Sequence, residues 1–88
     1  MIVVDTHIVI GIDDRSVTVQ CPFNNVGPWQ VPVEEIGICV IGEVLSTESG
    51  GWDILREEEL DQLNEDGWKM LNDFLEIHNM KFSDLIFG

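Results

Sequence analysis

Acidic side chains are the most numerous groups in this sequence that could do chemistry. The chain has 17 Asp and Glu residues against four Lys and Arg, a formal net charge of -13, and 44% hydrophobic residues. Because disordered acidic segments are poor in large apolar residues, this composition predicts a folded protein. A surface of this sign repels nucleic acid and anionic lipid and attracts basic proteins. We therefore expect a basic protein surface as the partner, with no direct nucleic-acid binding and no membrane binding.

The acidic residues concentrate in the second half of the chain. Residues 45–88 hold eleven acids and three basic residues, and six acids with no base lie between Glu57 and Asp66. Like charges four residues apart on a helix are destabilising by about 0.2–0.5 kcal/mol per pair, which suggests a use beyond stability. The alternative explanation is that first-turn acids favour the helix dipole and that acidity aids solubility. The predicted partner-binding residues are Glu57, Glu58, Asp61, Glu65, Asp66, Asp73 and Glu76, with Trp68 as an anchor if it is exposed.

Carboxylates on one face of a helix would form a row of negative charge. With a spacing of about 5.4 Å per turn, such a row could engage Arg and Lys groups that otherwise hold phosphates. In size and charge the chain resembles small acidic immunity proteins and phage-encoded inhibitors of nucleases. The sequence therefore favours a non-enzymatic binding protein, an inhibitor or immunity-like factor that blocks a basic nucleic-acid-handling protein. The alternative is a small structural or assembly module that self-associates as a homodimer, with acidity serving solubility. Trp29 and Trp52 are further candidates for aromatic contacts.

Histidine and cysteine give little sign of catalysis. His7 and His78 are the only histidines, and neither has a nearby Ser or Cys in a recognisable nucleophile setting. His7 is expected to form an exposed ion pair with Asp5, and His78 is expected near a helix C-terminus, where the dipole favours it. Cys21 and Cys39 lie in apolar runs without CxxC spacing, so we expect free thiols and no zinc site. No cofactor and no metal are expected, and the protein is not predicted to be an enzyme.

Two short segments carry a family resemblance. The opening Ile2-Val3-Val4-Asp5-Thr6-His7-Ile8-Val9-Ile10 resembles the first strand of PIN-domain ribonucleases, and Ile38-Cys39-Val40-Ile41-Gly42-Glu43-Val44-Leu45 loosely resembles the segment bearing their second acid. The resemblance implies a metal held by Asp5 and Glu43, and hence a fragment of a metal-dependent ribonuclease as a second alternative. It covers about a fifth of the chain. Between the two segments that family has helices, whereas this sequence has a hairpin pattern and a proline-rich loop.

Apolar periodicity predicts the elements that must position these residues. Alternation with a period of two predicts strands over residues 2–12 and 16–22, joined as a hairpin. In residues 36–45, the odd-numbered and the even-numbered positions are both mainly apolar. This predicts a central strand that is covered on both sides. Residues 51–55 alternate again and predict a fourth strand. Residues 22–32 contain all three prolines and are expected to form a loop.

A period of three to four residues begins at Glu57. Its apolar stripe predicts an amphipathic helix over residues 57–79 that packs on the sheet. Gly67 lies within this stripe, so it either ends a first helix or lets a neighbour approach closely, and a break near Asn64 to Gly67 is plausible. The fold class is therefore α+β: a small antiparallel sheet of about four strands followed by a C-terminal amphipathic helix.

Residues 1–88 are expected to form one domain with one core. The start of the chain lacks the pattern of a secretory signal, and no apolar run approaches the ~20 residues of a membrane span, which predicts a cytoplasmic protein. The apolar C-terminal segment must dock on the core, extend the sheet or cover a partner subunit. The predicted core residues are Ile8, Ile10, Val17, Val19, Ile38, Val40, Leu60, Leu63, Leu71 and Phe74.

Overall fold

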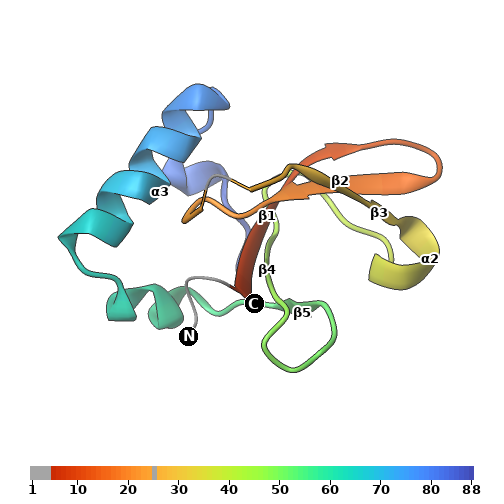
Figure 1. The fold of residues 1–88 in the computed structure, drawn as a ribbon, viewed down its shortest axis with the longest axis horizontal. Helices are drawn as coiled ribbons and strands as arrows, with labels where there is room; N and C mark the ends of the chain where they lie inside the picture. The colour runs from red at the N-terminus through yellow and green to blue at the C-terminus, as the bar shows by residue number, and fades with distance from the viewer. Residues whose placement is uncertain (1–4, 25) are drawn as a thin grey trace.

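The computed structural model describes residues 5–24 and 26–88, and it has the predicted α+β class. The start of the first expected strand, residues 2–4, lies outside the described residues. Figure 1 shows a twisted sheet with the longest helix packed across one side of it. The elements are β1 (Thr6–Ile12), β2 (Ser16–Gln20), β3 (Trp29–Pro32), α2 (Val33–Ile36), β4 (Val44–Ser46), β5 (Asp53–Ile54), the 3-10 helix η1 (Glu57–Gln62), α3 (Glu65–Ile77) and the 3-10 helix η2 (Phe82–Asp84).

The sheet has five strands in the order β3-β2-β1-β4-β5, and each of these pairings is antiparallel. The predicted hairpin is present as β1 and β2. Its turn is held by Asp13, whose Oδ1 accepts the backbone N–H groups of Arg15 at 2.8 Å and Ser16 at 2.7 Å. The predicted fourth strand is present as β5. The prediction of a loop over 22–32 is wrong at its end, because residues 29–32 form the edge strand β3. A proline such as Pro32 is tolerated at the edge of a sheet.

The central strand expected over residues 36–45 is not formed. A single helical turn, α2, precedes a loop, and only residues 44–46 join the sheet as β4. Gly37 and Gly42 have φ values of 87° and 98°, a conformation that interrupts a strand and that glycine adopts most easily. Ile38 is 96% exposed and Val40 is exposed as well, so both were wrongly assigned to the core. The central position of the sheet belongs to β1 instead.

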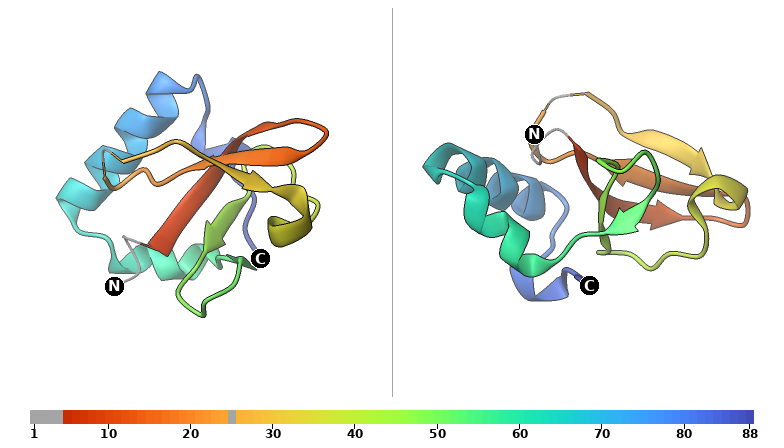
Figure 2. Two further views of the ribbon diagram at one scale, coloured as in Figure 1. Left: turned by 45° about the vertical axis from the view of Figure 1, so that its right-hand side comes forward. Right: turned by 90° about the horizontal axis from the view of Figure 1, so that it is seen from below.

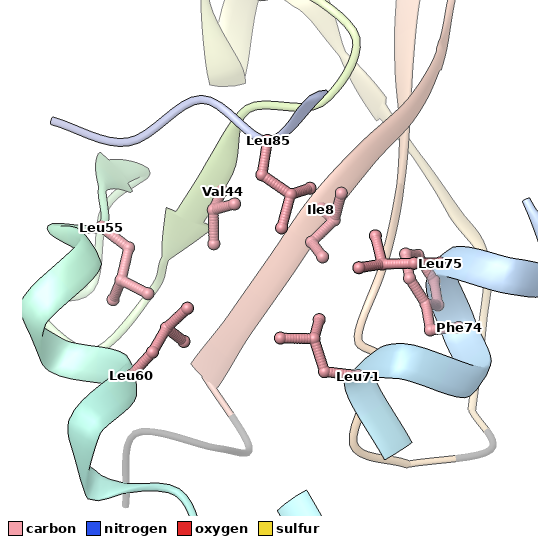
Figure 3. Packing of buried hydrophobic residues seen from close by; sticks show 8 residues of the cluster. All are labelled: Ile8, Val44, Leu55, Leu60, Leu71, Phe74, Leu75 and Leu85. Carbon is pink, nitrogen blue, oxygen red and sulfur yellow. The ribbon is translucent and has the colours of Figure 1, made fainter. Parts of the chain in front are cut away.

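One face of the sheet packs against the helices. Figure 3 shows Ile8 of β1 and Val44 of β4 meeting Leu71, Phe74 and Leu75 of α3. Leu55, Leu60 and Leu85 complete this buried cluster. Full burial of one such side chain stabilises the folded state by roughly 1.5–3 kcal/mol relative to leaving it exposed. The predicted core residues Ile8, Val17, Val19, Leu60, Leu71 and Phe74 are buried, whereas Ile10 and Leu63 are half-buried.

The other face of the sheet is also apolar. Its buried residues are Val9, Val17, Val19, Val31 and Leu45, packed against Ile36, Cys39 and Trp52. Ile8 pairs with Gln20 and Val9 with Val19, and the register shifts between Val9 and Gly11. The apolar residues of β2 therefore lie on the face of Val9, not on that of Ile8. Both sides of β1 are therefore covered, so the hairpin does not have one buried and one solvent-exposed face.

The predicted helix over 57–79 is broken into η1 and α3. Leu63 and Asn64 have extended ψ values of 137° and -176°, and the Asn64 side chain accepts the N–H of Gly67 at 2.8 Å as the N-cap of α3. Gly67 lies in the first turn of α3, where a Cβ would come within 3.0 Å of Leu63 Cδ2. The break is thus confirmed, and Gly67 permits a close approach instead of ending a helix.

The C-terminal segment docks on the molecule's own core. Leu85 is buried, the N–H of Val44 donates to the carbonyl of Ile86 at 3.0 Å, and the N–H of Ile86 donates to the carbonyl of Gly42 at 2.9 Å. Figure 2 shows this segment passing close to β4. Two of the three expectations for this segment are observed: Leu85 docks on the core, and Ile86 forms a parallel bridge with Glu43 that extends the sheet beside β4. Among the helices that the structure describes, none is long and apolar enough to cross a membrane.

Candidate functional site

The predicted acidic residues all lie on the surface. Glu57, Glu58, Asp61, Glu65, Asp66, Asp73 and Glu76 are exposed. The break at residues 63–64 distributes them over two elements, η1 and α3, which run in different directions (Figures 1 and 2). The continuous row of carboxylates expected on one helix face is therefore replaced by two adjoining acidic surfaces. We call the seven residues together the acidic surface.

Trp68 is not a free aromatic anchor. It is half-buried, packs against the core cluster and lies 6.0 Å from the ring of Phe82, measured between ring centroids. Its ring is thus largely committed to the fold. Only its exposed part could add to the contacts of Asp66 and its neighbours.

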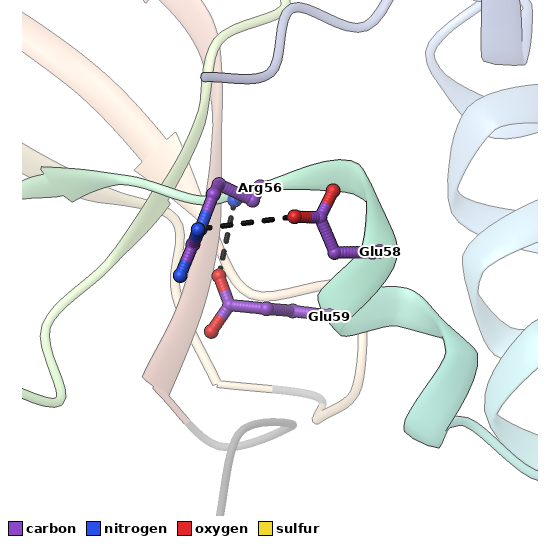
Figure 4. A network of polar contacts seen from close by, with 3 residues as sticks. All are labelled: Arg56, Glu58 and Glu59. Carbon is purple, nitrogen blue, oxygen red and sulfur yellow. Dashed lines mark hydrogen bonds and ion pairs between the residues drawn. The ribbon is translucent and has the colours of Figure 1, made fainter.

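Few cations neutralise the acidic surface. In residues 5–24 and 26–88, the ion pairs are Arg56 Nε with Glu58 Oε1 and Lys69 Nζ with Asp73 Oδ2, each at 3.9 Å and between well exposed side chains. Pairs of this kind contribute about 0–1 kcal/mol. Figure 4 shows Glu59 beside the first of them, where its Oε2 accepts the Arg56 N–H at 3.0 Å. Glu59 therefore serves the start of η1 itself.

The helix dipole accounts for part of this charge. Glu57 and Glu58 lie in the first turn of η1, and Glu65 and Asp66 in the first turn of α3, where negative charge is favourable. Glu76 is in the last turn of α3, where the dipole disfavours it. Local stability thus explains the acids at the helix starts but not Glu76.

A second feature is a hollow of about 400 Å³ on the sheet face opposite α3, which we call the aromatic pocket. The ring of His7 lies between those of Trp29 and Trp52, with centroid distances of 5.7 and 5.3 Å and interplanar angles of 63° and 66°. Glu35 of α2 and Thr47 also line it. Both tryptophans were candidates for aromatic contacts, but no local pattern in the sequence places them beside one histidine.

His7 does not form the exposed ion pair expected with Asp5. It is half-buried, and its Nδ1 lies 3.2 Å from the backbone carbonyl of Asp5. Burial lowers the pKa of His7 below its usual value, although the Asp5 backbone contact and carboxylate oppose this shift. His7 is therefore neutral at pH 7. Because a carbonyl only accepts, Nδ1 carries the proton and Nε2 is left as an acceptor.

His78 lies at the C-terminal end of α3, as the sequence predicted. Its Nε2 is 3.2 Å from Gln20 Oε1, and its ring centroid is 4.4 Å from that of Phe74. These contacts connect the helix to β2. They give His78 a structural role that needs no catalysis.

Cys21 and Cys39 are not joined by a disulfide, and Cys21 is buried while Cys39 is half-buried. Burial raises the pKa of both thiols, and for Cys39 the nearby Glu43 carboxylate adds to the effect. Neither is activated as a nucleophile. Among the described residues, no group of three His, Cys, Asp or Glu could hold a metal ion.

The residues of the PIN-domain resemblance have local contacts. Glu43 Oε1 accepts the N–H of Val40 at 2.8 Å, which closes the turn before β4. The strand pairs β1–β2 and β1–β4 are antiparallel, which differs from the parallel sheet of that family. Comparison with family models, curated proteins and solved structures found no match to this chain.

Proposed function

We propose that this protein is a non-enzymatic acidic binding protein that engages a basic surface on another protein. Its most concrete form is an inhibitor or immunity-like factor that covers the nucleic-acid-binding surface of a basic protein. The observation that supports this proposal is the acidic surface: seven exposed carboxylates on consecutive elements, with only two long ion pairs among the described residues. Charge of one sign speeds encounter with an oppositely charged partner and disfavours competitors of like charge.

A second candidate is a self-associating assembly module, favoured by the apolar loop after α2. Ile38, Val40 and Ile41 are 96%, 49% and 55% exposed, which is unusual for three apolar residues within a segment of four. The C-terminal segment supports this alternative less strongly, because Leu85 is buried within the chain, while Phe82 and Ile86 stay 37% and 39% exposed. Under this alternative, sedimentation would show a concentration-dependent dimer that Ile38→Ser weakens.

The test of acidic capture compares two charge-reversal variants of equal net charge. The first replaces Glu58, Asp61 and Glu65 by lysine, and the second replaces the exposed acids Asp14, Glu34 and Glu48, which lie outside η1 and α3. Each is used as bait in cell extract at about 0.05 and 0.3 M salt, because screening over a Debye length of roughly 14 and 6 Å separates electrostatic capture from apolar contact. Bound proteins are identified by mass spectrometry.

We expect a basic protein that the wild type captures at low salt and releases at higher salt. The first variant should lose it and the second should retain it. A nucleic-acid oligonucleotide should displace the captured protein from the bait, since the proposal places the bait and the nucleic acid on the same surface of that protein. Equal loss in both variants, or capture of no basic protein at either salt concentration, would contradict the proposal.

A further inference from the structure

The aromatic pocket has the composition of a site for an organic cation. Indole faces carry negative electrostatic potential and attract cations more strongly than other side-chain rings do. Trp29 and Trp52 both line the pocket beside the neutral ring of His7. Among the described residues that line it, Glu35 is the only acid and none is Lys or Arg. A cationic ligand would therefore meet two π-systems and one carboxylate without a competing positive charge.

The backbone holds the pocket in place before any ligand arrives. The Asp5 carbonyl that receives the His7 Nδ1–H also accepts the N–H of Thr47 at 3.0 Å, which connects the start of β1 to the segment after β4. Trp29 pairs with Val19 across the β2–β3 ladder. Rings held in this way lose little conformational entropy on binding, which preserves affinity.

Gly27 supports the position of Trp29. At φ 98°, a Cβ on this residue would lie 3.0 Å from Cε3 and 3.1 Å from Cζ3 of the indole. The backbone thus lies against one side of the ring. About two fifths of the residue's surface stays open, since Trp29 is 39% exposed. This leaves a fixed but accessible indole at the edge of the sheet.

The polar lining distinguishes between classes of cation. Besides Glu35, the pocket offers acceptors from Thr47 and Gln30, and Nε2 of His7 is an acceptor in the neutral ring. A guanidinium group has five N–H donors and a planar face that stacks on indole. A quaternary ammonium has no donor and would leave these acceptors unmatched. The volume of about 400 Å³ lies in the lower range of ligand pockets and is sufficient for one long side chain.

We propose that the aromatic pocket binds the guanidinium group of an arginine side chain on the basic partner protein. That the arginine comes from a basic partner protein rests on the proposed function. Binding of a guanidinium group in the pocket can be tested without the partner. The acidic surface would accelerate encounter, and the pocket would supply the specific contact. Trp and Arg are enriched among the interface residues that carry most of the binding energy.

The test uses blocked single amino-acid amides as probes, with ionic strength held constant. N-acetyl amides of arginine, lysine, trimethyllysine and norleucine are titrated into isotopically labelled protein, and the indole N–H resonances are followed by NMR. The chain has three tryptophans, so Trp68, on the other side of the sheet, is an internal control. Each resonance is assigned with a single Trp→Phe variant.

We expect the arginine amide to shift the resonances of Trp29 and Trp52 with a dissociation constant in the millimolar range, and to leave that of Trp68 unchanged. Lysine should bind more weakly and norleucine should not bind. Glu35→Gln should weaken arginine binding about three- to tenfold, whereas its exposed neighbour Glu34→Gln, with the same loss of charge, should change it less than twofold.

If the arginine amide binds, three outcomes would still overturn the proposal. These are equal binding of norleucine, tighter binding of trimethyllysine than of arginine, and equal effects of the two glutamine variants. Circular dichroism of each variant establishes that it is folded before titration. A failed titration alongside partner capture that depends on the acidic surface would refute the pocket and leave the proposed function standing. Arginine binding in the absence of partner capture that depends on the acidic surface would support the pocket and refute the proposed function.

Discussion

Replacement of Asn64 by alanine tests the break between η1 and α3. Asn64 has an extended backbone, with φ -84° and ψ -176°, and its side-chain oxygen accepts the N–H of Gly67 at 2.8 Å. Loss of such an N-cap costs about 1 kcal/mol, within a range of roughly 0.5–2 kcal/mol. We therefore expect Asn64→Ala to lower the free energy of unfolding by about that amount.

Asn72 provides a matched control, since it is an exposed asparagine in the middle of α3. Alanine is the better helix former there, so Asn72→Ala should stabilise the protein by about 0.5 kcal/mol. If residues 57–79 formed one continuous helix, Asn64 would also be in a helix interior and its replacement by alanine would stabilise. A broken helix and a continuous helix thus predict changes in the free energy of unfolding of opposite sign for Asn64→Ala.

Thermal unfolding followed by circular dichroism at 222 nm measures both variants. For a domain of this size, 1 kcal/mol corresponds to a shift in Tm of roughly 4–8 °C, so Asn64→Ala should lower the Tm by about that much. Asn72→Ala should raise it by about 2–4 °C. Asn64→Ser, which keeps a capping oxygen, should recover most of the loss. Stabilisation by Asn64→Ala, or no recovery by serine, would refute the capping argument.

The remaining predictions concern close approach, pH and thiol reactivity. A Cβ on Gly42 would lie 2.6 Å from a backbone oxygen, whereas nothing lies within 4 Å of one on Gly37, and both residues have positive φ. Urea unfolding should therefore show that Gly42→Ala costs about 2 kcal/mol more than Gly37→Ala, and equal costs would contradict the observed packing. Burial lowers the pKa of His7 below its ordinary value of 6.5. As the pH falls through 6.5, His7 therefore gains a proton in the unfolded chain before it does so in the folded protein, which favours unfolding. Wild-type stability should then fall from pH 7 toward pH 5 relative to His7→Gln, and parallel pH profiles would count against this effect. A thiol reagent should label half-buried Cys39 in the native protein and Cys21 only on unfolding, whereas fast labelling of Cys21 would show that its burial is transient.

Local periodicity determined much of the fold. The alternation around Ile8 and Val19 is a direct consequence of the two-residue period of a strand, and Asp13 has the side chain that a tight turn uses. The stripe containing Leu60, Leu71 and Phe74 follows from the helical period. These signals depend only on neighbours in the chain, so they could be predicted without knowledge of the tertiary structure. The exposure of the acidic surface could be predicted in the same way.

The segment of residues 36–45 could not be predicted correctly. Hydrophobicity has no direction, so a run of apolar residues does not reveal which of them pair with β1. In the structure, Val44 and Leu45 are buried in the sheet while Ile38 faces outward. The turn at Gly42, held against Val9 of β1 by a 2.9 Å hydrogen bond, decides where pairing begins.

The aromatic pocket was decided by tertiary structure alone. His7, Trp29 and Trp52 are far apart in the sequence, and no local pattern connects them. The pairing of Val9 with Val19, and of Val19 with Trp29, places the first two rings on one face of the sheet. A shift of one residue in either register would move every side chain of that strand to the opposite face. The sequence by itself therefore determined the charge of the surface and the types of element, whereas long-range strand register determined which side chains meet.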